Sequence, residues 1–269
     1  MNPSESPIGL FDSGVGGLTV FREIASLLPN EDLIYLGDTA RLPYGNKSST
    51  TILHYAKECA SFLLKRGIKL LVIACHTASC HALEALQKSL PIPVIGMILP
   101  GIELIQTSNA QNIALLATHS TISSDIYQKA LLKQNPSIHV HAVACPLFVP
   151  LVEEGLYHHK IAKQTATHYL NHLRPKSIEA VLLACTHYPL LHAAIQESLG
   201  PSVQILNPTR RCAENVRHLL TNAGLLKQSS KKASYKFLTT DYLDQFAALA
   251  NIFLNFSMQR SDIELVTLH

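Results

Sequence analysis

Two stretches of the chain resemble each other. The first is Lys69-Leu-Leu-Val-Ile-Ala-Cys-His-Thr-Ala-Ser79, and the second is Glu179-Ala-Val-Leu-Leu-Ala-Cys-Thr-His-Tyr-Pro189. Each is a short apolar run that ends in Ala-Cys and continues with small polar residues, which predicts a buried parallel strand. Ligands bind beyond the carboxyl ends of such strands. We therefore expect Cys75 and Cys185, 110 positions apart, to end two strands and to face one substrate from two sides.

The strands around these stretches repeat in the same order. We expect strands over 8–12, 32–37 and 70–74 in the first half, and over 113–117, 138–144 and 180–184 in the second. The residues that close them are offset by 106 (Asp12 and Thr118), 107 (Asp38 and Cys145) and 110 (the two cysteines). A nearly constant offset indicates duplication rather than a short solenoid repeat. The fold class predicted is α/β, with two similar pseudo-symmetric domains, mainly parallel sheets and the active site in the cleft between them.

Two stretches rich in turn-forming residues mark the crossings between the halves, Pro91–Gly101 and Asn207–Glu214. They predict a first domain of residues 1–97 plus 211–269 and a second of residues 98–210. A strand from Lys236 and a helix over Tyr242–Phe256 should dock on the first half, because such a tail has no core of its own. Pro146–Glu154 is expected to parallel the loop Pro43-Tyr-Gly45. The remaining predicted helices cover residues 18–28, 48–66, 78–90, a segment from about 123, and 213–220.

The composition excludes several classes of protein. Hydrophobic residues make up 47% of the 269 residues and charged residues 15%, so the chain can bury a core and disorder is not expected over most of its length. The net charge of +3 comes with no long Lys/Arg cluster, which argues against a nucleic-acid partner. No run has the length of a membrane span, and the first residues carry no secretory signal pattern. Six cysteines in a chain of this length are expected to be thiols in the cytoplasm.

The turn Asp12-Ser-Gly-Val-Gly-Gly17 follows the first strand and precedes a helix. It lacks the last glycine of a dinucleotide-binding loop, because Thr19 stands there. A cradle of backbone N–H groups for a carboxylate is the better interpretation. A tight turn that only needs glycine is the simplest alternative.

The paired thiols suggest a specific chemistry. A thiol has an ordinary pKa of about 8.5, and a helix N-terminus lowers it toward neutral pH; both motif cysteines precede predicted helices. One thiolate could remove a proton from a carbon while the opposite thiol returns one to the other face, which inverts the configuration. In the reverse reaction the two sulfurs exchange roles, which explains why the two motifs look alike.

Other roles for the cysteines remain open. Cys75-His76 with Cys80-His81, or Cys185 with His187, could bind a metal, although zinc sites prefer closely spaced cysteine pairs. Cys185 with His187 could also form a nucleophile pair for acyl transfer, but that leaves the first motif unexplained. The other cysteines (Cys59, Cys80, Cys145 and Cys212) are expected to be small apolar filling residues.

With these motifs in place, the chain resembles the glutamate racemases of the aspartate/glutamate racemase family. The matching segments are Phe11-Asp-Ser-Gly-Val-Gly-Gly17, Gly37-Asp38, Pro43-Tyr-Gly45, Cys75-x-Thr-Ala-Ser79, Phe148-Val-Pro-Leu-Val-Glu-Glu-Gly155 and Cys185-Thr-His-Tyr-Pro-Leu-Leu191. They span most of the chain in the family's order. Three positions depart from the family's usual residues: His76 replaces Asn, Ala184 replaces Gly, and Asn207 replaces Asp.

The resemblance implies roles for individual residues. Cys75 and Cys185 would be the catalytic thiols, Asp12 would assist Cys75, and His187 and Glu153 would assist Cys185. The residues that bind the substrate would be Asp12, Ser13, Tyr44, Gly45, His76, Thr77, Thr118, Thr121, Thr186 and His187. Structural alternatives are a helix cap for Asp12, a core histidine for His187 and a surface helix residue for Glu153.

We therefore expect a cytoplasmic amino-acid racemase, an isomerase that interconverts L- and D-glutamate without pyridoxal phosphate, another cofactor or a metal. The resemblance also implies a supply of D-glutamate for peptidoglycan and a homodimer. The alternatives are a racemase or epimerase of another amino acid such as aspartate, and a non-catalytic amino-acid binding protein.

Overall fold

A computed structural model of the chain describes residues 3–229, 231–254 and 256–268. Its contacts separate two compact units. Unit 1 contains the residues up to Met97 and those from Thr209 onward, and unit 2 contains Ile98–Pro208. The expectation that the tail docks on the first half is confirmed. The domain boundaries at 97/98 and 210/211 stay a prediction.

Unit 1 is built on a parallel sheet with strand order β10-β9-β2-β1-β3-β4. The strands are β1 (Ile8–Asp12), β2 (Leu33–Gly37), β3 (Leu70–Ile73), β4 (Val94–Gly96), β9 (Tyr235–Thr239) and β10 (Ile263–Leu265). Every residue of β1, β2 and β3 is buried, as expected for parallel strands covered on both faces.

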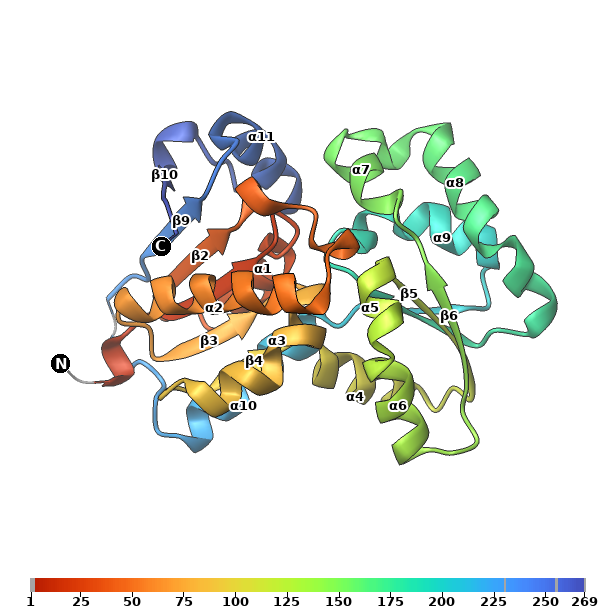
Figure 1. Cartoon of the computed structure of the whole chain (residues 1–269), viewed down its shortest axis with the longest axis horizontal. Helices are drawn as coiled ribbons and strands as arrows, with labels where there is room; N and C mark the ends of the chain where they lie inside the picture. The colour runs from red at the N-terminus through yellow and green to blue at the C-terminus, as the bar shows by residue number, and fades with distance from the viewer. Residues whose placement is uncertain (1–2, 230, 255, 269) are drawn as a thin grey trace. The chain divides into compact units, whose positions relative to one another are not determined.

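Helices cover both faces of this sheet (Figure 1). They are α1 (Leu18–Leu27), α2 (Ser49–Lys65), α3 (His76–Ser89), α10 (Thr209–Asn222) and α11 (Leu243–Phe253). On one face α2 packs with α3 over a core that includes Phe11, Leu36 and Ile73. On the other, α1 packs with α10, and Phe21 contacts the rings of Tyr35 and Phe237. The loops after β1, β2 and β3 therefore leave a firmly packed sheet at its carboxyl edge.

Unit 2 has a parallel sheet with strand order β6-β5-β7-β8. The strands are β5 (Asn112–Ala117), β6 (His139–Ala144), β7 (Ala180–Ala184) and β8 (Gln204–Leu206). The helices are α4 (Ile98–Ser108), α5 (His119–Ser124), α6 (Ile126–Gln134), α7 (Phe148–Glu153), α8 (Lys160–Leu170) and α9 (His192–Leu199). α8 packs with α9, and α4 packs with α6 and β7 (Figure 1). The α/β class with parallel sheets is confirmed.

The two sheets share a strand order, because β2-β1-β3-β4 corresponds to β6-β5-β7-β8. Asp12 pairs with Gly37 in unit 1, and Ala117 pairs with Ala144 in unit 2, so Asp38 and Cys145 occupy equivalent positions. Cys75 and Cys185 are equivalent by the same register. Asp12, however, corresponds to Ala117, so Thr118 is the equivalent of Ser13 and the sequence pairing of Thr118 with Asp12 was wrong by one residue.

Several predicted helix starts were wrong. α3 begins at His76 instead of residue 78, because Cys75 itself caps the helix. α5 begins at His119, capped by Thr118, which is ahead of the expected start near 123. A second helix, α6, begins after that position, at Ile126. α10 begins at Thr209 instead of 213. Pro146–Glu154 contains the helix α7, so it does not copy the Pro43-Tyr-Gly45 loop, which forms a short 3-10 turn over Tyr44–Asn46.

Candidate active site

Cys75 follows β3 and is the N-cap of α3 in unit 1. Its side chain is 6% exposed, and its Sγ accepts a hydrogen bond from the backbone N–H of Ala78 at 3.4 Å. The Sγ also lies 3.7 Å from the hydroxyl of Ser13. A sulfur at a helix N-terminus faces the positive end of the helix dipole, which favours the thiolate form of a cysteine. The position suits a thiol that exchanges a proton.

Asp12 ends β1, next to the strand that delivers Cys75. Its carboxylate is 1% exposed, and one oxygen accepts the N–H of Gly14 at 3.0 Å. The turn after it is closely packed, because a Cβ added to Gly17 would lie 2.6 Å from Cβ of Asp12. The glycine-rich turn thus holds a buried carboxylate one register position away from Ser13 and Cys75.

His76 and Thr77 form the first turn of α3 and are buried, with exposed fractions of 2% and 3%. Burial lowers the pKa of His76 to about 3, so its imidazole is neutral at physiological pH. A neutral imidazole carries one donor and one acceptor nitrogen. His76 therefore brings polarity but no charge to the residue after Cys75.

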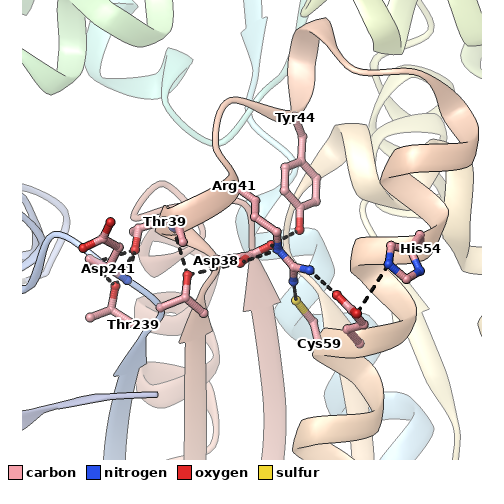
Figure 2. Close-up of polar contacts among 11 residues, drawn as sticks. Asp38, Thr39, Arg41, Tyr44, His54, Cys59, Thr239 and Asp241 are labelled. Carbon is pink, nitrogen blue, oxygen red and sulfur yellow. Dashed lines mark hydrogen bonds and ion pairs between the residues drawn. The ribbon is translucent and has the colours of Figure 1, made fainter. Parts of the chain in front are cut away.

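Tyr44 and Gly45 lie in the loop that follows β2, and both are buried. The Tyr44 hydroxyl donates a hydrogen bond to the carboxylate of Asp38 (Figure 2). Burial is the largest cause that raises the pKa of Tyr44 above its ordinary value, so the phenol keeps its proton for this bond. Because the side chain is engaged within unit 1, any contact of this pair with a substrate falls mainly to the backbone.

Cys185 follows β7 in unit 2 and is 7% exposed. Its equivalence with Cys75 does not extend to the capping, because the next helical element is a short 3-10 helix (Tyr188–Leu191) that precedes α9. The expectation that both motif cysteines directly precede helices was therefore wrong for Cys185. Its Sγ lies 4.0 Å from Nδ1 of His187 instead.

His187 connects Cys185 to Glu153, because its Nε2 lies 3.0 Å from Oε1 of Glu153. The imidazole is 4% exposed. Burial lowers the pKa of His187, but the hydrogen bonds with Cys185 and Glu153 outweigh it and raise the pKa to about 10. The three side chains form a row of thiol, imidazole and carboxylate, within which a protonated His187 can donate a proton to the Cys185 thiolate.

The threonines of unit 2 surround the same strand ends. Thr118 caps α5, and its hydroxyl accepts the N–H of Thr121 at 3.3 Å. Thr121 is fully buried, and Thr186, next to Cys185, is 4% exposed. The register of β5 and β7 places Thr118 beside Cys185, as Ser13 lies beside Cys75. The structure thus groups the site residues predicted for each unit at the carboxyl edge of that unit's sheet.

The other four cysteines (Cys59, Cys80, Cys145 and Cys212) are buried, and the Cys59 sulfur lies 3.7 Å from the guanidinium of Arg41. All six are thiols without a disulfide. Burial raises the pKa of Cys145 above its ordinary value and that of Cys212 to about 12, as expected for inert filling residues. Over the described ranges, which omit residues 1, 2, 230, 255 and 269, no three His, Cys, Asp or Glu side chains lie close enough together to hold a metal ion.

Sequence reasoning missed Asp38 and Arg41 as parts of the site's support. The carboxylate of Asp38 is fully buried and receives both the Tyr44 hydroxyl and Nε of Arg41, at 2.7 Å for the nearer oxygen. Asp38 follows a buried strand at the same sheet edge as Cys75, and Arg41 follows three residues later. That position and spacing are the signals that could have identified this pair.

Comparisons with known proteins identify the family of this chain. The Asp/Glu/hydantoin racemase family matches residues 8–216. The chain belongs to this family. A glutamate racemase from Geobacter metallireducens is 46% identical over 248 residues, which cover 92% of each chain.

Solved structures of family members have the same fold. A glutamate racemase from Francisella tularensis in complex with D-glutamate superposes with a TM-score of 0.92 at 38% identity and covers 98% of each chain. One from Thermus thermophilus in complex with beta-chloro-D-alanine gives a TM-score of 0.88 at 39% identity, again over 98% of each chain. Within the described part of the chain, no helix is long and apolar enough to cross a membrane.

Proposed function

We propose that this protein is an isomerase that interconverts L- and D-glutamate, with Cys75 and Cys185 as the two acid/base thiols. The observation that carries the proposal is the equivalence of the two cysteines, which follow corresponding strands in two sheets of the same order. A reaction that runs in both directions through mirror-related steps needs one such group for each face of the Cα atom. Relatives that cover over nine-tenths of the chain are named glutamate racemases.

In the proposed reaction one cysteine, as thiolate, removes the Cα proton and becomes a thiol. The electron pair left on Cα is shared with the adjacent carboxylate. The other cysteine, as thiol, donates its proton to the opposite face and becomes a thiolate. The product is the other enantiomer, and the net change in the protein is the transfer of one proton equivalent from one sulfur to the other. Neither an oxidant nor a cofactor is required to balance these steps.

The residues next to each thiol transfer the protons that return the two sulfurs to their starting protonation states. On the Cys185 side this is His187, whose protonation Glu153 stabilises. On the Cys75 side we assign the role to Asp12, one register position away from Cys75, with the Ser13 hydroxyl at 3.7 Å from the sulfur. The two sides differ in charge, so the two proton removals should differ in pH dependence.

The groups that hold the substrate are proposed to be the glycine-rich turn at Asp12 and Ser13, the backbone of Tyr44 and Gly45, and the polar residues beside the two thiols (His76, Thr77, Thr118, Thr121, Thr186 and His187). Backbone N–H groups and hydroxyls are suited to bind the carboxylates and the ammonium group of an amino acid.

The cellular role follows from the same proposal. We assign the enzyme to the cytoplasm, where it would supply D-glutamate for peptidoglycan, and we expect it to act as a homodimer. Light scattering after size-exclusion chromatography tests the dimer, since a mass of one chain, 29.5 kDa, would contradict it.

The function is tested by incubating the purified protein with L- or D-glutamate in heavy water. We expect the circular dichroism of either enantiomer to decay to zero, with deuterium entering Cα. Cys75→Ser and Cys185→Ser should each abolish inversion, and each should lose Cα exchange with a different enantiomer. Inversion of aspartate instead of glutamate would redirect the substrate assignment. Full activity in either variant, or glutamate binding without exchange, would overturn the two-thiol mechanism.

A further inference from the structure

The loop that carries Tyr44 and Gly45 is held from two sides within unit 1 (Figure 2). On one side, Arg41 forms an ion pair with Glu58 of α2, and its guanidinium lies 4.2 Å from the ring centroid of Tyr55. On the other side lies the segment Thr239–Asp241, which ends β9 and leads to α11. This second segment lies outside residues 8–216, the part of the chain that the racemase family matches.

Thr240 contacts the loop at two points. Its hydroxyl donates to Oδ1 of Asp38 at 3.1 Å and accepts the backbone N–H of Ala40 at 2.9 Å. Its own backbone N–H donates to the carbonyl of Gly37 at 3.1 Å. One side chain therefore fixes both the turn that begins after β2 and the carboxylate that holds Tyr44.

Thr39 makes a second set of contacts with the same segment. Its hydroxyl donates to the carbonyl of Asp241 at 2.7 Å and accepts the N–H of Asp241 at 2.8 Å. It also lies 2.8 Å from the hydroxyl of Thr239, which is fully buried. Figure 2 shows Thr39, Thr239 and Asp241 grouped on the opposite side of Asp38 from Tyr44 and Arg41.

Asp38 links these contacts to the substrate loop. Its carboxylate is fully buried, and it receives Thr240 on one oxygen, the Tyr44 hydroxyl on the other, and Nε of Arg41 within 3.0 Å of both. A buried carboxylate keeps its charge only while such donors surround it. Removal of one donor should therefore shift the positions of the other two, and with them the backbone at Tyr44 and Gly45.

We propose that Thr240 is a positioning residue of the racemase: through Asp38 and the Ala40 N–H it fixes the loop whose Tyr44-Gly45 backbone binds a substrate carboxylate. The proposal rests on the function proposed above. β9 makes the segment rigid, because it pairs with β2 from Tyr235 beside Leu33 to Thr239 beside Gly37. The tail thus contributes to substrate binding without touching the substrate.

The test compares Thr240→Val, which removes the hydroxyl but keeps the shape, with Thr240→Ser, which keeps the hydroxyl. Thr167→Val is the matched control, since Thr167 is also half-buried and its hydroxyl bonds to Ser198 in unit 2. For Thr240→Val we expect KM for glutamate to rise about tenfold with kcat within about twofold, because a hydrogen bond to a charged group is lost. Thr240→Ser and Thr167→Val should retain the KM of the wild type.

A second measurement does not depend on activity. In hydrogen–deuterium exchange, the peptide spanning residues 38–46 should exchange faster in Thr240→Val but not in Thr240→Ser or Thr167→Val. Thr240→Ala, which removes the same hydroxyl, should repeat both effects and replaces Thr240→Val if that variant fails to fold. An unchanged KM, unchanged exchange, or no rescue by serine would overturn the positioning role. A wild-type protein that does not racemise glutamate would defeat the proposed function instead, and the exchange data would still decide whether Thr240 fixes the loop.

Discussion

Nε2 of His187 lies 3.0 Å from Oε1 of Glu153, although one residue follows β7 and the other ends α7. The other ring nitrogen faces Sγ of Cys185 at 4.0 Å. Burial alone would lower the pKa of His187, but its two hydrogen-bond partners raise it to about 10. The imidazole is therefore a cation at neutral pH, held between the Cys185 sulfur and the Glu153 carboxylate.

This pair predicts a loss of stability at alkaline pH. The pKa of His187 is higher in the folded protein than its ordinary value of 6.5, so its contribution is fully present below pH 6.5 and is lost as the pH rises through 10. Glu153→Gln should reduce the free energy of unfolding by about 1–3 kcal/mol at pH 7 and flatten its decline toward pH 10. Urea denaturation across this range measures both effects. The same alkaline decline in wild type and variant would contradict the assignment.

His76 predicts the opposite dependence at acid pH. Burial lowers its pKa from 6.5 to about 3, so the unfolded chain binds a proton that the folded protein does not. Stability should therefore fall as the pH drops from 6.5 toward 3, and His76→Asn should flatten this decline. His192→Asn is the control, because His192 is exposed and its replacement should leave the decline of stability at acid pH unchanged. An equal fall in stability toward acid pH in wild type and His76→Asn would show that His76 also takes up a proton in the folded state.

A buried ion pair stabilises the end of the unit 1 sheet at which β2 and β3 begin, opposite to the end that carries Cys75. Nζ of Lys69 lies 2.5 Å from Oε2 of Glu31 and donates to the carbonyl of Ser4 at 2.6 Å, and both charged side chains are at most 2% exposed. Glu31→Gln should cost about 3–5 kcal/mol, because it leaves a buried ammonium without its partner. Adding Lys69→Met should recover most of that loss in chemical denaturation. A double variant no more stable than Glu31→Gln would mean that the lost stability lies outside the pair.

Gly17 tests how closely the turn at Asp12 is packed. A Cβ on this residue would lie 2.6 Å from Cβ of Asp12 and 2.9 Å from both Cβ of Ala74 and the Tyr35 hydroxyl. Gly17→Ala should destabilise the fold by about 1–3 kcal/mol and, by displacing Asp12, lower racemase activity more than tenfold. Gly67→Ala is the comparison, since Gly67 has open space around it but φ of +76°. That variant should cost about 1 kcal/mol and leave activity unchanged. Full activity of Gly17→Ala would separate Asp12 from catalysis.

Much of the fold could be predicted because buried parallel strands have a direct signature in sequence. Lys69–Ser79 and Glu179–Pro189 each contain an uninterrupted apolar run, and the strands β3 and β7 lie within them. The helix starts were harder, because hydroxyl and thiol side chains at the caps decide them. Thr118 and Cys75 both accept a hydrogen bond from the third residue beyond, which moves each helix start ahead of its apolar pattern.

The sequence nominated individual site residues, but it did not indicate the contacts that hold them in place. Glu153 and His187 lie 34 positions apart, and the family resemblance implied only that both would assist Cys185, not that they bond to each other. Thr240 and Asp38 are separated by 202 positions, and no local pattern indicates that they meet. Their contact depends on the pairing of β9 with β2, which is decided by the packing of the tail rather than by any short motif.

The tail also allows β2 to be apolar and buried along its whole length. β2 is buried along its whole length because β9 covers it, whereas its equivalent β6 is the open edge of its sheet and has exposed and half-buried positions at His139 and His141. A chain cut after α10 would leave the backbone of Leu33–Gly37 unpaired on an apolar edge, which is a template for strand addition between molecules. Such a shortened protein should self-associate. Among the described residues, β6 is the outer strand of its sheet at the corresponding position, and it carries polar residues there.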